Sequence, residues 1–282
     1  MTHTPPPRRL SDRAVIALRG PDARSLLQGL VTQNLDRVSP DQAAFAALLS
    51  PQGKILAEMV ISADGADGLW LDTATHTAAD LHKRLKLYKL RATVELADCS
   101  DTHGVGWTAP STDGSGANGA GWADPRGAGL GQRQVAPLEA LDASADEAWR
   151  VAKFEVGLAE CGPDFAPNQL FPADVNMDLR HGVDFKKGCF IGQEVVSRMK
   201  RKGGQRKRTL LLDFDQPVAP GAALTLDDLP VGETLTTLET RALAVLRVDR
   251  IAEAQAWGET LKTADGARGR IVNADWLLGQ DG

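Results

Sequence analysis

Residues 186–203 read KKGCFIGQEVVSRMKRKG, and this stretch decides how the rest of the chain is interpreted. A single cysteine, Cys189, follows two lysines and lies between two glycines. The letters IGQEVVSRMK have the pattern of a helix, so Cys189 is expected at or just before a helix N-terminus. That position and the neighbouring Lys186 and Lys187 would both stabilise a thiolate. We therefore predict that Cys189 is the most reactive thiol; the alternative is a small thiol buried at a tight turn.

Cations are concentrated around this segment. Residues 180–208 contain ten basic and two acidic residues, whereas the whole chain has a formal net charge of -5. This local reversal indicates an anionic partner, which could be RNA, a polyglutamylated cofactor or an acidic protein. A solvated connection between domains is the alternative, and the pattern leaves both open. The run 198–208 has no interleaved aromatic residues, which counts against base stacking.

The composition is that of an ordinary globular protein. The chain has 282 residues, of which 43% are hydrophobic and 24% charged, so it can bury a sizeable core. The first ten residues lack an apolar run, and no stretch approaches the length of a bilayer span, so we expect neither a secretory signal nor a membrane association. Three sparse cysteines without a CxxC pair, and five scattered histidines, predict reduced thiols, no stably bound metal and a cytoplasmic location.

The hydrophobic periodicity predicts an α+β chain. Over residues 14–98 it indicates the order β-α-β-β-β-α-β, with helices packed on a largely antiparallel sheet. Residues 110–121 are predicted to form a glycine-rich loop, and 145–160 a helix. From residue 209 onward short apolar segments alternate with Gly and Pro, which is typical of a small β-barrel. A domain boundary is therefore expected near 203–208.

Residues 186–203, which we call the signature segment, also resemble a conserved motif of a known family. Its pattern K-G-C-[FY]-x-G-Q-E is matched here by seven residues, namely Lys187, Gly188, Cys189, Phe190, Gly192, Gln193 and Glu194. The match resembles the YgfZ-type folate-binding proteins, a branch of the glycine-cleavage T-protein superfamily. Further stretches agree in order, including GPDARSLLQGLVTQNL, LLSPQGKILAEMVI and RALAVLRVDR. The resemblance covers nearly the whole chain except the loop near 100–140.

The resemblance implies a particular architecture. Family members resemble a three-lobed ring, with two ferredoxin-like α/β lobes and a C-terminal β-barrel around a central opening for tetrahydrofolate. On this basis residues 1–45 with 143–203 would form a discontinuous folate-binding lobe. Residues 46–142 would form the second lobe, and 204–282 the barrel.

The resemblance also implies a function. It points to a tetrahydrofolate-binding accessory factor for the assembly or repair of iron–sulfur enzymes, acting as a monomer with those enzymes or with cluster-assembly proteins. An indirect link to tRNA modification is part of the same implication. Two alternatives stay open, a folate-dependent aminomethyltransferase or other one-carbon transferase, and a tRNA-binding accessory module. Three separated cysteines cannot supply the four ligands of a stable cluster, so no stably held cluster is expected, and a transient cluster or a reactive thiol stays open.

Several residues are implied to form the site. The acidic pair that T-proteins use to activate folate corresponds here to Ala57-Glu58, so aminomethyl transfer is not expected. Trp149 matches an aromatic position that stacks on folate; the alternative is a tryptophan packed in the core. Arg13 falls at a second such position, where it could stack or pair with a carboxylate. Asn34 matches a polar position lining the opening; the alternative is a turn residue. The signature adds Cys189 as the reactive thiol, Glu194 and Arg198 as further cofactor-binding residues, and Gln193 as a residue that fixes the loop.

Overall fold

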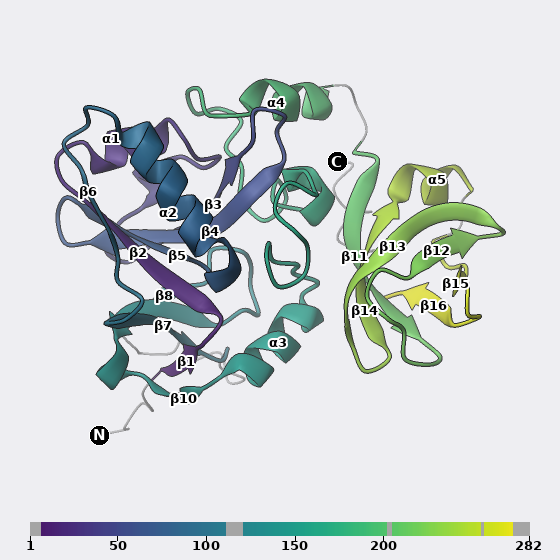
Figure 1. The fold of residues 1–282 in the computed structure, drawn as a ribbon. Helices are drawn as coiled ribbons and strands as arrows, with labels where there is room; N and C mark the ends of the chain where they lie inside the picture. Colours follow the sequence, from purple (N-terminus) through teal and green to yellow (C-terminus); the bar gives the residue numbers. More distant parts are fainter. Residues whose placement is uncertain (1–6, 111–120, 202–204, 255–256, 273–282) are drawn as a thin grey trace.

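The protein consists of two five-stranded sheets and a closed six-stranded barrel (Figure 1). This computed structural model describes residues 7–110, 121–201, 205–254 and 257–272. The predicted α+β class with a C-terminal barrel is confirmed. Most of the predicted loop at 110–121 lies outside the described residues. None of the helices in the described ranges is long and apolar enough to cross a membrane.

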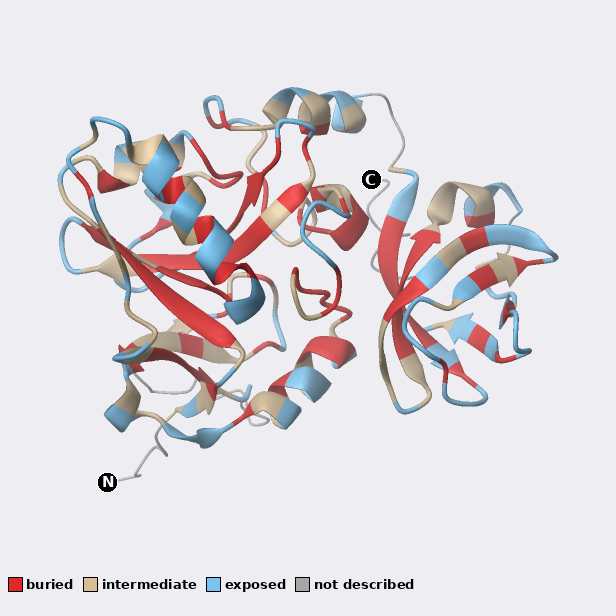
Figure 2. Cartoon of the chain, in the orientation of Figure 1, coloured by how far each residue is buried: buried red, intermediate tan, exposed pale blue. Residues whose placement is uncertain are grey.

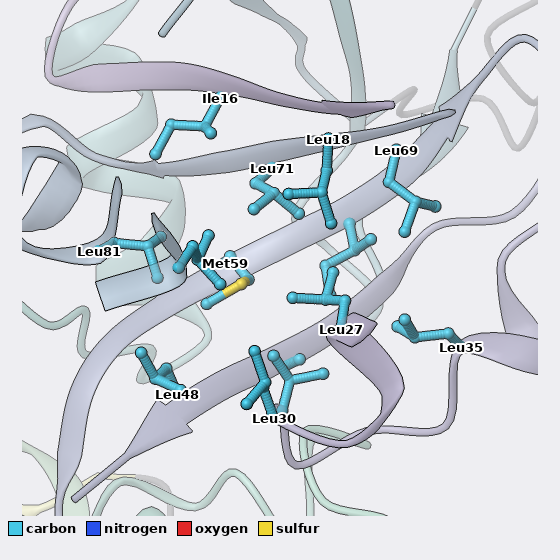
Figure 3. Packing of buried hydrophobic residues seen from close by; sticks show 14 of the residues in the cluster. Ile16, Leu18, Leu27, Leu30, Leu35, Leu48, Met59, Leu69, Leu71 and Leu81 are labelled. Atoms are coloured by element: carbon cyan, nitrogen blue, oxygen red, sulfur yellow. The ribbon is translucent and has the colours of Figure 1, made fainter. Parts of the chain in front are cut away.

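The first sheet confirms the predicted order of elements. Its strands run in the order β3-β4-β5-β2-β6, and each neighbouring pair is antiparallel. Two helices, α1 (Ala23–Gln28) and α2 (Thr75–Lys89), cover one face and bury the leucine-rich core shown in Figure 3. The strands are β2 (Arg13–Arg19), β3 (Ala44–Leu49), β4 (Ile55–Asp64), β5 (Gly68–Ala74) and β6 (Glu95–Asp98).

The second sheet packs against the face of the first that the helices leave uncovered. Val15 of β2 shares a buried cluster with Val105, Trp107 and Trp149, which belong to the second sheet and the helix beside it. That helix is α3 (Asp146–Glu155). The sheet order is β10-β1-β7-β9-β8, formed by β1 (Arg8–Leu10), β7 (His103–Thr108), β8 (Trp122–Ala123), β9 (Gln132–Pro137) and β10 (Asp142–Ser144).

The lobes differ from the division expected from the sequence. A boundary between residues 45 and 46 would cut through β3, and β2 pairs with β5 across it from Arg13↔Ala74 to Leu18↔Leu69. The strand β7 at residues 103–108 instead pairs with β1, and β9 at residues 132–137 pairs with β7, so both belong to the second sheet. Hydrogen-bond partners between strands determine the lobes, and the sequence pattern identifies strands without identifying their partners.

The barrel closes in the order β11-β14-β13-β12-β15-β16. Side chains alternate along β11, so that Leu210 and Leu212 fill the barrel while Leu211 packs outward on the body of the protein. The helix α5 (Val248–Glu253) follows β14. The strands are β11 (Lys207–Phe214), β12 (Ala223–Leu226), β13 (Leu229–Leu238), β14 (Arg241–Arg247), β15 (Leu261–Thr263) and β16 (Arg268–Ile271).

The signature segment lies where the barrel meets the first sheet. A buried cluster joins Phe45 and Ile55 of the β3–β4 hairpin, Phe190 and Val196 of the signature, and Val245 of the barrel. Figure 2 shows that the strands in the middle of the molecule are mostly buried, while much of the outer side of α2 is exposed. Two further helices belong to this junction, η3 (Pro172–Val175) and α4 (Gln193–Arg201). The hairpin therefore supports the segment that carries Cys189.

Candidate functional site

The signature loop is fixed to the β3–β4 hairpin by close backbone contact. Gly192 has a φ of +78°, and a Cβ there would lie 2.7 Å from the Ser50 carbonyl oxygen. Gly53 in the hairpin turn has a φ of +81°, and a Cβ there would lie 3.1 Å from Val195. Both glycines allow a conformation and an approach that other residues disfavour. The second glycine of the cysteine motif, Gly192, thus allows α4 to pack closely on the hairpin.

Lys187 anchors the loop at a second point. Its ammonium donates hydrogen bonds to the carbonyl oxygens of Gln28 (2.6 Å), Val31 (2.6 Å) and Gln33 (3.0 Å), at the end of α1 and just beyond it. Burial lowers its pKa to about 8, and the nearby Asp184 partly opposes this. An ammonium has three N–H donors, and these carbonyls use all three. The structure therefore differs from the expectation that Lys187 stabilises a Cys189 thiolate, because carbonyls at a helix C-terminus attract the cation instead.

Cys189 is exposed, and the other two cysteines are not. Cys161 is buried and Cys99 is half-buried. Burial, with a smaller contribution from Glu58, raises the pKa of the Cys161 thiol strongly. A Cβ at Gly188 would meet no atom within 4 Å, so the space beside Cys189 is open. Since α4 begins at Gln193, the prediction that Cys189 just precedes a helix is confirmed.

The sequence-predicted residues fall into two groups. Glu194 and Arg198 lie exposed on α4, beside the half-buried Gln193. Arg13 and Trp149 instead belong to the buried interior between the two sheets. Asn34 is the N-cap of the short helix η1 (Leu35–Arg37), where its side chain accepts hydrogen bonds from the Asp36 amide and from Gln28. These contacts are those of a turn residue, which was the alternative for this position.

The interior group contains a closed ring of alternating charges. Arg13 pairs with Asp72 (2.6 Å), and Asp72 with Arg133 (2.5 Å). Arg133 pairs with Asp124 (2.8 Å), and Asp124 with Arg126 (2.7 Å). Glu160 closes the ring to Arg126 (2.6 Å) and Arg13 (3.2 Å), and every side chain in it is at most 3% exposed. We call these six residues the ionic ring.

Trp149 is held by the ionic ring. The guanidinium groups of Arg133 and Arg126 lie 4.5 Å and 5.1 Å from its ring centroid. Its indole N–H donates to Glu160 at 3.2 Å, and the residue is 2% exposed. These contacts are those of a core tryptophan, the alternative weighed for this position. Arg13 likewise pairs with carboxylates of this chain, so neither residue offers a free ring or guanidinium to a folate.

Lys153 extends the ring. It pairs with Glu160 (3.5 Å) and with Asp164 (2.8 Å), so that four cations meet four carboxylates. The cations around it hold the pKa of Glu160 well below its usual range against the effect of burial. The cluster is therefore internally balanced, and each charge has a partner that compensates part of its desolvation.

Glu58 lies beside this balanced cluster as an additional acid. Burial raises its pKa to about 7, and Glu160 contributes in the same direction. Its Oε2 accepts a hydrogen bond from the Cys161 amide (2.6 Å), whereas its buried Oε1 has no hydrogen-bond partner among the described residues. Glu58 holds a position of the acidic pair expected from T-proteins, but it is tied to the backbone of the segment that follows α3.

Sequence reasoning missed most of the ionic ring. Five members, Asp72, Asp124, Arg126, Arg133 and Glu160, were not predicted. The one local signal is Asp72, a charged residue inside the apolar strand GLWLDT. Charged residues are almost never fully buried without a partner, so this strand indicated a buried ion pair without naming the cation.

Three kinds of known protein resemble the chain. Residues 206–278 match the family of the CAF17 C-terminal beta-barrel domain. The chain is 31% identical over 237 residues to an iron-sulfur cluster assembly factor IBA57 homolog, mitochondrial, of Chaetomium globosum, covering 71% of this chain and 54% of that protein. For the homolog of Mycosarcoma maydis the identity is 32% over 227 residues, with 73% and 56% covered. For IBA57 of Mus musculus it is 28% over 253 residues, with 77% and 70% covered.

A solved structure shows the same fold. The crystal structure of glycine cleavage system aminomethyltransferase T from Bartonella henselae superimposes with a TM-score of 0.70 at 16% identity, over 96% of this chain and 86% of that one. The T-protein-like fold expected from the sequence is thereby confirmed, and at this identity the likeness shows the fold alone. Assignment to the YgfZ branch stays a prediction.

The comparisons correct one expectation. The chain spans about half the length of the two fungal relatives, and their names, like that of the mouse protein, include the word mitochondrial. The prediction of a cytoplasmic location is therefore wrong. Sparse, reduced cysteines argue against an oxidising compartment, but they do not tell one reducing compartment from another.

Proposed function

We propose that this protein is an assembly factor for iron–sulfur proteins in which the Cys189 thiol is the working group. The observation that carries the proposal is an exposed cysteine on a loop that is fixed at both ends, by Lys187 and by Gly192. A thiolate is the ligand that iron–sulfur clusters take. The names of the relatives support the same assignment.

A single exposed thiol limits the number of cluster ligands that the chain can supply. Iron–sulfur clusters are usually held by four protein ligands, and here the other two cysteines are half-buried or buried. Within the described ranges no three His, Cys, Asp or Glu side chains lie close enough to hold a metal ion. The remaining ligands of a cluster on Cys189 would therefore come from a partner, so the proposal is a transient, shared cluster or a thiol acting on a partner's cluster.

The test is complementation by cysteine variants in cells that lack the protein. Cys189→Ala should abolish the activity of dependent iron–sulfur enzymes while leaving the urea unfolding curve unchanged. Cys99→Ala is the matched control at the half-buried thiol and should keep that activity. Full enzyme activity with Cys189→Ala would refute the thiol role.

Tetrahydrofolate binding is the second part of the proposal. The residues implied by the resemblance do not fit folate as they stand, because Trp149 and Arg13 are both engaged in the buried cluster. The nearby hollow bounded by Gln33, Asp124 and His181 has a volume of about 230 Å³, at or below the lower end for ligand pockets. Binding would therefore require the cluster to open. Calorimetric titration with reduced tetrahydrofolate under argon tests this, and the absence of saturable heat would remove folate from the proposal.

One-carbon transfer is the competing function, favoured by the fold it shares with an aminomethyltransferase. The β3–β4 hairpin carries one carboxyl at the position of the T-protein acidic pair, that of Glu58. This carboxyl is buried and accepts a hydrogen bond from the Cys161 amide. An assay for turnover of an aminomethyl or methyl donor with tetrahydrofolate decides between the two. Turnover that depends on Glu58 would replace the assembly-factor proposal, whereas support of iron–sulfur enzymes without turnover would sustain it.

A further inference from the structure

Two hollows meet beside the C-terminal half of α4, where this helix faces the first strand of the barrel (Figure 1). One has a volume of about 220 Å³ and the other about 500 Å³. Both have Phe171, Met199 and Gln205 in their walls, so they form one continuous depression. We call it the α4 groove. None of the ionic ring, the hairpin glycines or Cys189 lines it, so its role is separate from the features described above.

The α4 groove carries uncompensated positive charge. Four cations in its walls, Lys54, Lys200, Arg206 and Lys207, have no carboxylate of the described residues within ion-pair distance. The other two arginines in its walls, Arg208 and Arg247, are each paired with an aspartate. This arrangement is the opposite of the ionic ring, where every cation has a carboxylate. Unpaired cations that gather in a hollow favour an anionic ligand.

The carboxylates in the walls do not cancel this charge. Asp178 is paired with Arg208 at 2.6 Å. Asp174 accepts hydrogen bonds from the Phe171 amide (3.0 Å) and from the Gln205 side chain (3.0 Å). Burial raises its pKa, and the charges of Lys207 and Arg208 oppose this, so Asp174 offsets at most one of the four cations. The four unpaired cations therefore determine the sign of the ligand.

The apolar part of the groove suits a peptide side chain better than a nucleic-acid base. The Lys54 ammonium lies 5.7 Å from the centroid of the Phe171 ring, and the Lys200 ammonium 3.8 Å from that of Phe185, so a cation is already stacked on each ring. The remaining apolar wall is aliphatic or thioether, as at Val196 and Met199. Base stacking requires a free aromatic face, whereas a methionine adapts its shape to an inserted apolar side chain.

We propose that the α4 groove binds an acidic segment of a partner protein, with one apolar side chain inserted beside Met199 and carboxylates beside Lys54 and Lys207. The helix α4 connects this groove, at its C-terminal half, with Cys189, which precedes its N-terminus. From Gln193 to Arg201 it spans nine residues, which at 1.5 Å per residue is about 13 Å. A partner held here lies within reach of Cys189. This last step rests on the proposed function, whereas binding of the acidic segment does not.

The experiment is a selection from a random nine-residue peptide library displayed on phage, with the full-length chain as bait. Enriched peptides should combine at least two Asp or Glu residues with one large apolar residue. The affinity of a fluorescein-labelled enriched peptide, measured by fluorescence anisotropy, should fall at least tenfold in the double variant Lys54→Glu/Lys207→Glu. The matched control Lys86→Glu/Lys262→Glu, with exposed lysines on α2 and β15, should leave it unchanged.

Several outcomes would overturn the proposal. These are enrichment without acidic residues, no enrichment at all, or equal loss of affinity in both double variants. Single-stranded RNA that binds tighter than the peptide and loses affinity in the Lys54→Glu/Lys207→Glu variant would assign the groove to nucleic acid. Peptides that copy residues 275–278, DWLL, would assign it to the chain itself. Peptide binding must also persist in Cys189→Ala, which separates failure of this inference from failure of the proposed function.

Discussion

Replacing Glu58 by glutamine should make the protein more stable at neutral and alkaline pH. Burial raises the pKa of this carboxyl from 4.5 to about 7. Between these values the unfolded chain has released the proton while the folded chain still holds it. Stability therefore falls as pH rises through this window and is constant above it. Each pKa unit corresponds to about 1.4 kcal/mol, so the ionised carboxyl costs the folded state about 3 kcal/mol above pH 7.

The assay is urea unfolding of the native protein and of Glu58→Gln at several pH values from 4 to 8. The glutamine keeps the acceptor for the Cys161 amide but does not titrate. We expect the difference in free energy of unfolding between variant and native protein to grow by about 3 kcal/mol from pH 4 to pH 8. Glu139→Gln, at an exposed position, is the control and should show no such trend. A constant difference, or one that shrinks with rising pH, would refute the reasoning.

Three further outcomes are expected. Asp72→Asn opens the ionic ring and should lower the free energy of unfolding by about 3–5 kcal/mol. The control Asp80→Asn, in an exposed ion pair, should lower it by less than about 1 kcal/mol. Equal losses of the two variants in urea titrations would contradict a buried ring. Gly192→Ala forces a Cβ against the Ser50 carbonyl and should cost about 1–3 kcal/mol, while Gly188→Ala, with open space, should be nearly neutral by calorimetry. Iodoacetamide should alkylate Cys189 first in the native protein, and mass spectrometry that finds another cysteine modified faster would exclude it as the accessible thiol.

The sequence was sufficient for the elements that depend on local pattern. The order of strands and helices from 14 to 98, the helix after Cys189 and the C-terminal barrel all follow from hydrophobic periodicity and turn residues. The pairing of strands could not be predicted in this way, because the sequence pattern of β2 or β5 is the same whichever strand lies next to it. The lobe boundary at residue 45 failed for that reason.

The interior chemistry was hidden from the sequence for a different reason. Asp124, Arg126 and Glu160 each read as ordinary surface charge, and only the packing of two sheets brings them together. The same holds for Lys187, whose partners are carbonyls more than 150 residues away. From the sequence, Trp149 could either stack on a ligand or pack in the core. In the structure it packs in the core against arginines such as Arg133, which come from other parts of the chain. Long-range electrostatic partners are the information that a local pattern lacks.

The strand β4 joins the two halves of the candidate site. Gly53, just before this strand, contacts α4 behind the signature loop, and Glu58 within it contacts the segment that bears Glu160. A buried ion cluster adds little net stability compared with apolar packing, but it admits few alternative alignments because each charge requires its partner. The ionic ring therefore fixes how the second sheet sits on the first, and β4 extends that alignment to the loop of Cys189. Under the proposed function the Cys189 thiol has to reach a partner's cluster at a defined place, and a loop with a fixed base satisfies that requirement.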